Sequence, residues 1–337
     1  MAKIRIPRGW EIPEREVTPR SVYANRRQLL KSLGVTAGAA IAGGCGIGVE
    51  GLDLNTDGTV ESGPLATPRT DVFDLYLQDA MNNPTYEVRE RALTDFTSAA
   101  SFNNYYEYTT TKSRVWELVG VFEPDPWTVR VHGLVENELT LGLEDLAQRF
   151  EIEERIYRHR CVERWAMTVP WNGFPLRALL AQAQPLSSAR YVRFTTLSRP
   201  SQQPGLDAFR GDWPYYEALT IEEAELDLAF LVVGMYGEAL PAQNGSPLRL
   251  ALPWKYGYKS IKAIVDIELV EEQPPTFWND VRPDEYGFYS NVDPNVPHPR
   301  WSQAREWLIP NTEDVVDTQL YNGYADFVSS IYTGDEY

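Results

Sequence analysis

Short segments with the two-residue hydrophobic period of β-strands recur along this chain, and they limit its possible folds more than any other feature. Residues 127–133 (WTVRVHG) alternate and end at a glycine, which predicts a strand. Segments of the same kind follow at 191–197, 228–235, 248–252 and 261–270. A domain dominated by β-structure is therefore predicted.

Helical spacing is limited to three brief segments among these strands. They lie at 141–150, 174–184 and 221–226. Pro185 ends the second of them. This mixed order, with few and short helices, favours the α+β class over an alternating parallel sheet. We predict one mixed, β-dominated domain over residues 71–337.

The last part of this domain has a different character. After Glu272 the chain is rich in proline, tryptophan and tyrosine and loses its periodicity. Such a stretch is ordered only by packing over a neighbouring surface. We therefore expect an irregular C-terminal tail that wraps the domain and is not an independent unit.

Charge and composition exclude several functions. The chain has 31 lysines and arginines against 48 acidic residues, a formal net charge of −17, so a nucleic-acid or anionic-membrane binder is disfavoured. Two cysteines cannot build a disulfide framework, and three scattered histidines cannot build a histidine-rich metal site. If the protein uses a metal, a cofactor must supply most of its ligands.

The N-terminal residues have the pattern of an export signal. Arg26 and Arg27 precede a charge-free, glycine- and alanine-rich run at 32–49, as in twin-arginine signals. A membrane anchor is the alternative, but this run is poor in strongly apolar residues. We predict a signal region over residues 1–50 and a polar linker over 51–70, and the sequence leaves open whether Cys45 is lipidated.

Cys161 is the only cysteine beyond the signal region. Arg158, Arg160 and Arg164 flank it, which predicts a lowered thiol pKa and a thiolate that attacks carbon or binds a soft metal. The alternatives are a buried, inert cysteine and, with His159 two positions away, the Cys/His pair of a hydrolase.

A second candidate feature is the cationic run at 249–262, which contains Arg249, Lys255, Lys259 and Lys262 and no acidic residue. Aromatic residues and a glycine are interleaved with these cations. The pattern suits a pocket for a small anion such as a phosphate ester, although a solvated surface is equally consistent with it.

Two shorter stretches add polar groups. The turn residues Asn244-Gly245 have amides that reach a ligand or simply join two strands of a hairpin. Residues 101–108 (SFNNYYEY) offer donors and acceptors suited to a polar heterocycle, because the paired Asn103 and Asn104 lie beside Tyr106 and Glu107. A polar surface loop is the plainer interpretation of this stretch.

Together these stretches resemble the sulfite oxidase superfamily of molybdopterin enzymes, and within it the family of protein-methionine-sulfoxide reductases. The resemblance runs in order through FNNYYEY, EERIYRHRCVERWAMTVPWNGFPL, LPAQNGSPLRL, PWKYGYKSIK, PDEYGFYSNV, HPRWSQA and NGYAD. It covers nearly all of the chain after the linker and includes the tail, so it implies a sulfite-oxidase-type molybdopterin-binding domain.

The resemblance also implies a cofactor and its site. Cys161 would be the one protein ligand of molybdenum, and a single pyranopterin per chain would supply two sulfur ligands. The implied pterin contacts are Asn103, Tyr106, Glu107, Thr196, Asn244, Arg249, Ser260, Ile261 and Lys262.

The implied function is reduction of methionine sulfoxide in exported, periplasmic proteins by removal of the sulfoxide oxygen. A membrane haem subunit fed by the quinone pool would donate electrons, and the twin-arginine machinery would export the folded protein. The alternatives are another molybdopterin oxidoreductase acting on a small sulfoxide, an N-oxide or sulfite, an exported cysteine hydrolase, and a non-enzymatic binding module.

Overall fold

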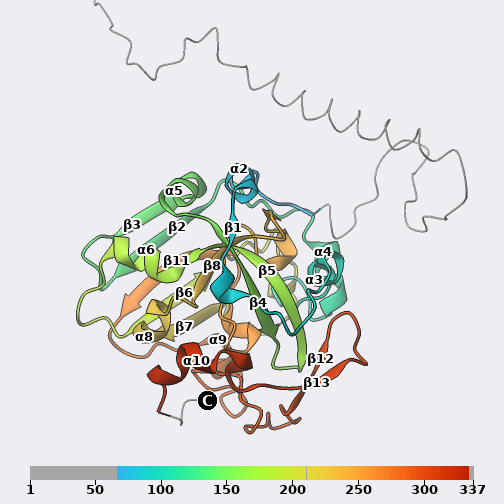
Figure 1. Ribbon diagram of the computed structural model, residues 1–337. Coiled ribbons are helices and arrows are strands. Elements are labelled where there is room, and N and C mark those ends of the chain that lie inside the picture. The colour runs from blue at the N-terminus through green and yellow to red at the C-terminus, as the bar shows by residue number, and fades with distance from the viewer. Residues whose placement is uncertain (1–66, 210, 334–337) are drawn as a thin grey trace, which may run out of the picture. The chain divides into compact units, whose positions relative to one another are not determined.

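The structure is a computed structural model that describes residues 67–209 and 211–333 (Figure 1). The predicted signal region, including Arg26, Arg27 and Cys45, and most of the predicted linker lie outside the described residues. The last linker residues pack on the domain: Thr67 and Thr70 are buried, and the amide of Ala242 donates to the carbonyl of Pro68 at 2.9 Å.

The described residues form two sheets, of eight and five strands. The larger sheet contains β1 (Met81–Asn82), β4 (Glu153–Arg160), β5 (Trp165–Pro175), β8 (Phe230–Met235), β9 (Glu238–Ala239), β10 (Arg249–Ala251), β12 (Arg305–Leu308) and β13 (Val315–Asp317). The smaller sheet has the order β3 (Leu139–Gly142), β2 (Thr128–Gly133), β11 (Ile264–Val270), β6 (Tyr191–Thr196) and β7 (Tyr216–Thr220).

The helices are few and short, and they flank these sheets (Figure 1). They are α2 (Asp74–Gln78), α3 (Phe96–Ser101), α4 (Val115–Leu118), α5 (Leu143–Arg149), α6 (Leu176–Ala183), α7 (Gly205–Ala208), α8 (Ile221–Glu225), α9 (Phe277–Val281) and α10 (Ala325–Val328). The α+β, β-dominated class is confirmed, and α5, α6 and α8 lie within the three predicted helical segments. No helix in residues 67–209 and 211–333 is long and apolar enough to span a membrane.

The central antiparallel pair of the larger sheet, β4 and β5, was not among the predicted strands. All but the last of the eleven residues of β5 are buried, so its sequence does not alternate. The strand β4 alternates weakly because the buried residues Arg155, Arg158 and Arg160 are charged. A strand buried on both faces reads as a continuous run, which period-two analysis does not detect.

The C-terminal tail is more regular than predicted. Two of its segments, β12 and β13, extend the larger sheet, and β12 pairs in parallel with β5 through Trp307 and Trp165. In Figure 1 the tail runs along the lower side of the domain, next to the ends of β4 and β5. The expected wrapping is present, and part of it is sheet extension, which brings the tail to the strands that frame Cys161.

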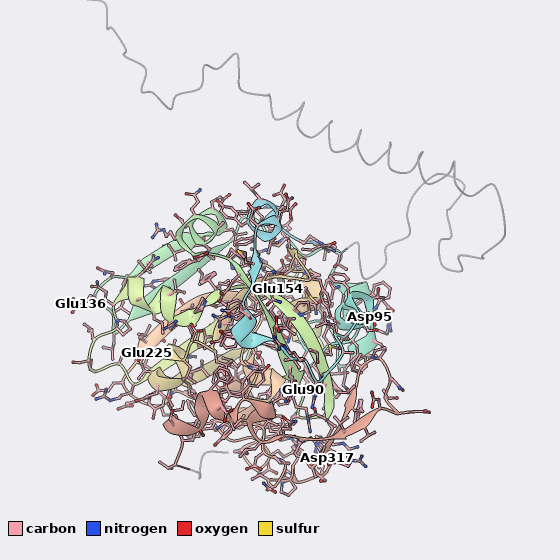
Figure 2. All side chains as sticks on the ribbon, viewed as in Figure 1. Glu90, Asp95, Glu136, Glu154, Glu225 and Asp317 are labelled. Atoms are coloured by element: carbon pink, nitrogen blue, oxygen red, sulfur yellow. The ribbon has the colours of Figure 1, made fainter. Side chains whose placement is uncertain are left out.

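Apolar packing and surface charge are separated as expected for a folded domain. The rings of Phe150 and Phe174 stack in the core with centroids 4.3 Å apart. Acidic side chains such as Glu90, Glu136 and Glu225 are exposed (Figure 2). Carboxylates placed in water keep the desolvation cost of the negative net charge low.

Candidate active site

Cys161 lies in the tight connection between β4 and β5. Arg160 and Ala166 are the last paired residues, and the amide of Cys161 donates to the carbonyl of Trp165 at 2.9 Å. Arg164 closes the turn with a φ of 74°, in the left-handed region, and its amide donates to the carbonyl of Cys161 at 2.9 Å. The two long strands thus place the thiol at a defined position at their end.

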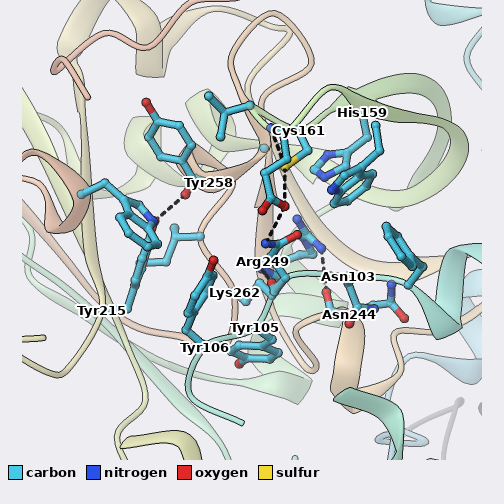
Figure 3. Close-up of a pocket in the computed structure, with 18 of the residues that line it drawn as sticks. Asn103, Tyr105, Tyr106, His159, Cys161, Tyr215, Asn244, Arg249, Tyr258 and Lys262 are labelled. Carbon is cyan, nitrogen blue, oxygen red and sulfur yellow. Dashed lines mark hydrogen bonds between the residues drawn. The ribbon is translucent and has the colours of Figure 1, made fainter. Parts of the chain in front are cut away.

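This turn opens onto a cavity of about 630 Å³, within the range of small-molecule and cofactor sites (Figure 3). Segments far apart in the sequence contribute its wall, including the loop after α3, the end of β4 and the cationic run. Eight of the ten predicted site residues line it: Asn103, Tyr106, Glu107, Cys161, Asn244, Arg249, Ile261 and Lys262.

The other two predicted site residues lie behind this wall. The Thr196 hydroxyl donates to the carbonyls of Lys262 and Ala263, at 2.5 and 3.2 Å. The Ser260 hydroxyl accepts a hydrogen bond from the amide of Leu252 at 3.1 Å. Both side chains brace the segment that carries Lys262, and their roles as cofactor contacts stay predictions.

The four cations of the run at 249–262 have two different roles in the structure. Lys255 is buried against Glu223, and Lys259 forms a buried ion pair with Glu217 at 2.6 Å. These two lysines are part of the fold and do not face the cavity. The alternative of a solvated cationic surface is therefore wrong for them, and an anion pocket built from all four cations is wrong as well.

Arg249 is one of the two cations of this run that line the cavity, and Arg282 and Arg300 of the tail also line it. Its guanidinium is buried and donates to the carbonyls of Asn244 at 2.8 Å and Ser260 at 3.2 Å. Burial lowers its pKa to about 10, which still leaves it charged at neutral pH.

Lys262 is the other cation of the run at 249–262 that lines the cavity. Its ammonium group donates to the carbonyl of Asn104 at 2.9 Å. Burial lowers the pKa of Lys262, and the positive charge of Arg249 lowers it further. Burial also raises the pKa of the Glu107 carboxyl, and the charge of Lys262 opposes that rise. Arg249 thus keeps its positive charge at this part of the cavity wall, and an anionic ligand group bound there would favour the charged form of Lys262 as well.

The Asn244-Gly245 pair does not form a hairpin turn. A 3₁₀ turn, η4 (Ala242–Asn244), ends at Gly245, whose φ is 99°. A Cβ atom on this glycine would lie 2.7 Å from the Cβ of Lys262. Glycine is therefore required both by the left-handed conformation and by the close approach that brings Asn244 beside Lys262.

The thiol of Cys161 is 7% exposed and faces the cavity (Figure 3). Its Sγ accepts from the amide of Glu163 at 3.4 Å, and the thiol donates to a Glu163 carboxylate oxygen at 3.8 Å. The same oxygen accepts from Asn104 Nδ2 at 3.0 Å and pairs with Lys112 at 3.1 Å. Burial raises the pKa of Cys161 to about 12, and the Glu163 charge adds to the rise.

The predicted lowering of this pKa by flanking arginines is wrong. Arg158 pairs with Glu90, and Arg160 pairs with Glu306 at 2.6 Å. The Arg164 guanidinium lies over the Trp307 ring, 4.9 Å from its centroid. Each arginine is directed to the fold rather than to sulfur, so their charges do little to offset the desolvation of a thiolate. A metal ion coordinated by this sulfur would favour the thiolate form, because a bound cation lowers the pKa of a coordinating thiol.

His159 also lines the cavity, but the geometry does not support a Cys/His pair. Within residues 67–209 and 211–333, the hydrogen-bond partner of the Cys161 thiol is Glu163 and not His159. Burial and the charges of Arg249 and Lys262 lower the His159 pKa to about 3. A thiol with a raised pKa and no hydrogen bond to the histidine is not the activated nucleophile of a Cys/His pair, which disfavours the cysteine hydrolase.

Several buried polar atoms on the cavity wall have no partner within the described residues. They include Nδ2 and Oδ1 of Asn103, Oδ1 of Asn244 and the indole Nε1 of Trp165. Buried polar groups are nearly always hydrogen-bonded, so these atoms indicate a polar ligand. Both donors and acceptors are present, next to two cations and one thiol, which fits a polar heterocycle that bears an anionic group and a thiolate-binding metal.

Other wall residues were not predicted from the sequence. They include Tyr105, Glu163, Trp165, Phe209, Tyr215, Trp278, Tyr286 and Trp301. Tyr105, Glu163, Trp165, Tyr286 and Trp301 lie in stretches that carry the family resemblance, but no role was assigned to them. Phe209, Tyr215 and Trp278 lie outside those stretches. For the tail residues, the unusual aromatic content was a signal, because buried rings in an aperiodic segment must pack against something.

Comparisons with known proteins agree with this geometry. The family described as "Oxidoreductase molybdopterin binding domain" matches residues 117–278. A protein of Burkholderia mallei named protein-methionine-sulfoxide reductase catalytic subunit MsrP is 46% identical, covering 97% of this chain and 94% of its own length. The protein of the same name from Pseudomonas syringae pv. tomato is 43% identical, covering 98% of this chain and 97% of its own length.

A solved structure is also similar. The sulfane dehydrogenase SoxCD of Paracoccus pantotrophus matches with a TM-score of 0.46 and 15% identity, covering 78% of this chain and 64% of that chain.

Proposed function

This chain belongs to the family of protein-methionine-sulfoxide reductase catalytic subunits, and we propose that it reduces methionine sulfoxide residues of other proteins in the cavity around Cys161. It is an oxidoreductase with a molybdopterin-binding domain. The observation that carries the proposal is one buried thiol beside two cations and a set of unpaired polar groups.

In this proposal Cys161 holds molybdenum through its thiolate, and each chain binds one pyranopterin. Asn103 and Asn244 bond the heterocycle with their unpaired amide atoms, and Arg249 and Lys262 bind its anionic group. Tyr106, Glu107, Ile261, Thr196 and Ser260 complete the proposed contacts or support them. When bound, the cofactor supplies the two-electron chemistry by which a sulfoxide, two electrons and two protons give a thioether and water.

The aromatic wall of the cavity would bind the substrate side chain. Tyr106 lies 5.1 Å from Phe209 and 5.3 Å from Trp278, and Trp278 lies 5.3 Å from Tyr286, measured between ring centroids. Sulfur and its methyl group pack favourably against such rings. All four rings line the same cavity as Cys161, so an apolar wall meets the site of reaction. The chain thereby orients a methionine sulfoxide and excludes water around it.

We further propose a cellular setting for this reaction. Residues 1–50 direct export of the folded protein to the periplasm by the twin-arginine route, and residues 51–70 link the signal to the catalytic domain over residues 71–337. The paired Arg26 and Arg27 support export. A membrane haem subunit, reduced by the quinone pool, would donate the electrons, and oxidised periplasmic proteins would be repaired. A lipid anchor at Cys45 is an optional part of this scheme.

The test is reduction of an oxidised protein by the purified holoenzyme with an artificial viologen donor. Mass spectrometry should show a loss of about 16 mass units, one oxygen atom, at each methionine sulfoxide residue that is reduced. Small sulfoxides, N-oxides and sulfite are tested in parallel. Faster turnover of one of these, with protein sulfoxides unchanged, would overturn the proposed substrate but leave the cofactor assignment intact.

A further inference from the structure

The C-terminal tail is bonded directly to the turn that carries Cys161. The next residue, Val162, offers its carbonyl oxygen to two donors from the tail. Trp301 Nε1 donates to it at 2.9 Å and Gln303 Nε2 at 2.8 Å. Gln303 is 1% exposed, so its bond is shielded from water. Two donors from a segment about 140 positions away therefore fix one peptide plane beside the cysteine.

The same glutamine also reaches the residue before the cysteine. Gln303 Oε1 accepts from the guanidinium of Arg160 at 2.9 Å, and that guanidinium also donates to the carbonyl of Cys161. Glu306 and Thr318, both from the tail, accept from Arg160 at 2.6 and 3.3 Å. The backbone on both sides of Cys161 is thus held by a buried network in which Gln303 takes part twice.

The backbone bonds of the turn alone would not fix the thiol direction. Within the described residues, the turn is closed by the bonds between Cys161 and Trp165 and between Arg164 and Cys161. The carbonyl of the peptide between Val162 and Glu163 receives its hydrogen bonds from Trp301 and Gln303 of the tail. Because Glu163 contacts the sulfur through its amide, rotation of that peptide would move a hydrogen bond to Sγ.

We propose that Gln303 and Trp301 are positioning residues for the Cys161 thiolate: by fixing the Val162 carbonyl they set the direction from which sulfur meets the metal. The inference rests on the proposed function, in which Cys161 is the molybdenum ligand. Groups that orient a ligand tune the metal even though they never touch it. The tail is then part of the active site's support and not only a cover of the domain.

The test compares two glutamines of the same tail. Gln303→Met removes both bonds of the network, whereas Gln319→Met removes a bond of the same kind, from Arg158 at 2.7 Å, that does not reach the cysteine turn. Both variants are purified as holoenzymes, and molybdenum content, thermal stability, kcat, KM and the electron paramagnetic resonance spectrum of partly reduced protein are measured.

Gln303→Met should retain molybdenum but show shifted g values and a roughly tenfold or larger fall in kcat at similar KM. Gln319→Met should keep the wild-type spectrum even if its melting temperature falls equally. Should Gln303→Met fail to fold, Trp301→Phe removes one donor to the same carbonyl while keeping an aromatic ring on His298, and a shifted spectrum is again expected.

Two results would contradict the inference, and they are distinguishable. Molybdenum-loaded Gln303→Met or Trp301→Phe protein with the wild-type spectrum would refute the positioning role alone. Wild-type protein without molybdenum would refute the proposed function and the positioning role with it.

Discussion

Replacing Lys255 with methionine should destabilise the fold far more than the same replacement of Lys262, although both belong to the cationic run at 249–262. The Lys255 ammonium group is buried, pairs with Glu223 and donates to Asn291 Oδ1 at 2.9 Å. Glu223 also accepts from the Tyr332 hydroxyl of the tail at 2.6 Å. Lys255 thus connects three separate segments through one buried charge.

The magnitude follows from what the substitution leaves behind. Lys255→Met leaves the Glu223 carboxylate, which is 1% exposed, without its buried countercharge. Breaking a buried ion pair in this way costs about 3–5 kcal/mol. For a domain of this size that is a fall in melting temperature of roughly 6–20 °C, at about 2–4 °C per kcal/mol. Lys262→Met loses one hydrogen bond, to the Asn104 carbonyl, which contributes about 1 kcal/mol. It also removes the charge that opposes the rise of the Glu107 pKa, and Glu107 then takes up a proton instead of remaining a buried carboxylate.

The assay is urea and thermal unfolding of the wild type and both variants, followed by tryptophan fluorescence. The double variant Lys255→Met/Glu223→Gln should recover part of the loss, because a neutral amide is cheaper to bury than a carboxylate. Lys262→Met should instead lower cofactor content. Equal stability losses in the two single variants, or a loss below about 1 kcal/mol for Lys255→Met, would refute the division of the run into structural and cavity-facing cations.

Three further predictions concern elements that frame the site. Asp95 caps α3, its carboxylate accepting from the Ser98 amide at 2.9 Å; Asp95→Ala should cost about 1 kcal/mol in urea unfolding at pH 7. The hydrogen bonds from Ser98 lower the Asp95 pKa in the folded state, so the stabilisation is present above the unfolded pKa and is lost as pH falls through the folded pKa. If Asp95→Ala lost as much stability at pH 2 as at pH 7, this reasoning would be contradicted. Gly245→Val should lower pterin fluorescence per chain, since φ is 99° and a Cβ would meet Lys262; full occupancy would exclude this crowding. Phe174→Ala, in a ring stack at 4.3 Å, should cost about 3–5 kcal/mol by denaturation, and a loss under about 1 kcal/mol would disprove tight packing there.

Much of the fold was predictable because period-two strands and capped helices are local signals. Strand β6 (Tyr191–Thr196) lies within its predicted segment, and α8 begins at a Thr220/Glu223 capping box. The central pair of strands was not predicted for a physical reason. Burial on both faces removes the alternation of apolar and polar residues from β5, and buried arginines make the inward-facing positions of β4 look polar. Pairing of β12 with β5 joins residues distant in sequence, which local patterns do not encode.

The candidate site was predictable where a residue type is itself unusual. A lone cysteine and a cationic run in an acidic chain both led to the cavity. The charge environment of Cys161 was not predictable, because neighbours in sequence such as Arg158 and Arg160 point to Glu90 and Glu306, far along the chain. The effect of an arginine charge on the Cys161 pKa depends on the position of its guanidinium group in the folded protein, which its position in the sequence does not predict.

The aromatic residues of the cavity wall were also not predictable from the sequence. Phe209 at the end of α7, Trp278 in α9 and Tyr286 in the loop after α9 meet with ring centroids 5.3–5.8 Å apart. Each residue alone is an ordinary aromatic in an irregular segment. Only the folded tail brings them together beside the thiol, so no spacing rule in the sequence identifies them.

The central claim is that Cys161 holds molybdenum while the cavity binds one pterin, and the most direct measurement is the metal and pterin content of purified protein. Wild-type and Cys161→Ser protein are prepared from the same cofactor-competent, export-competent host. We expect near-stoichiometric molybdenum and pterin in the wild type, and a lost or altered metal signal in the variant. Metal-free wild-type protein with a freely titratable thiol would contradict the account.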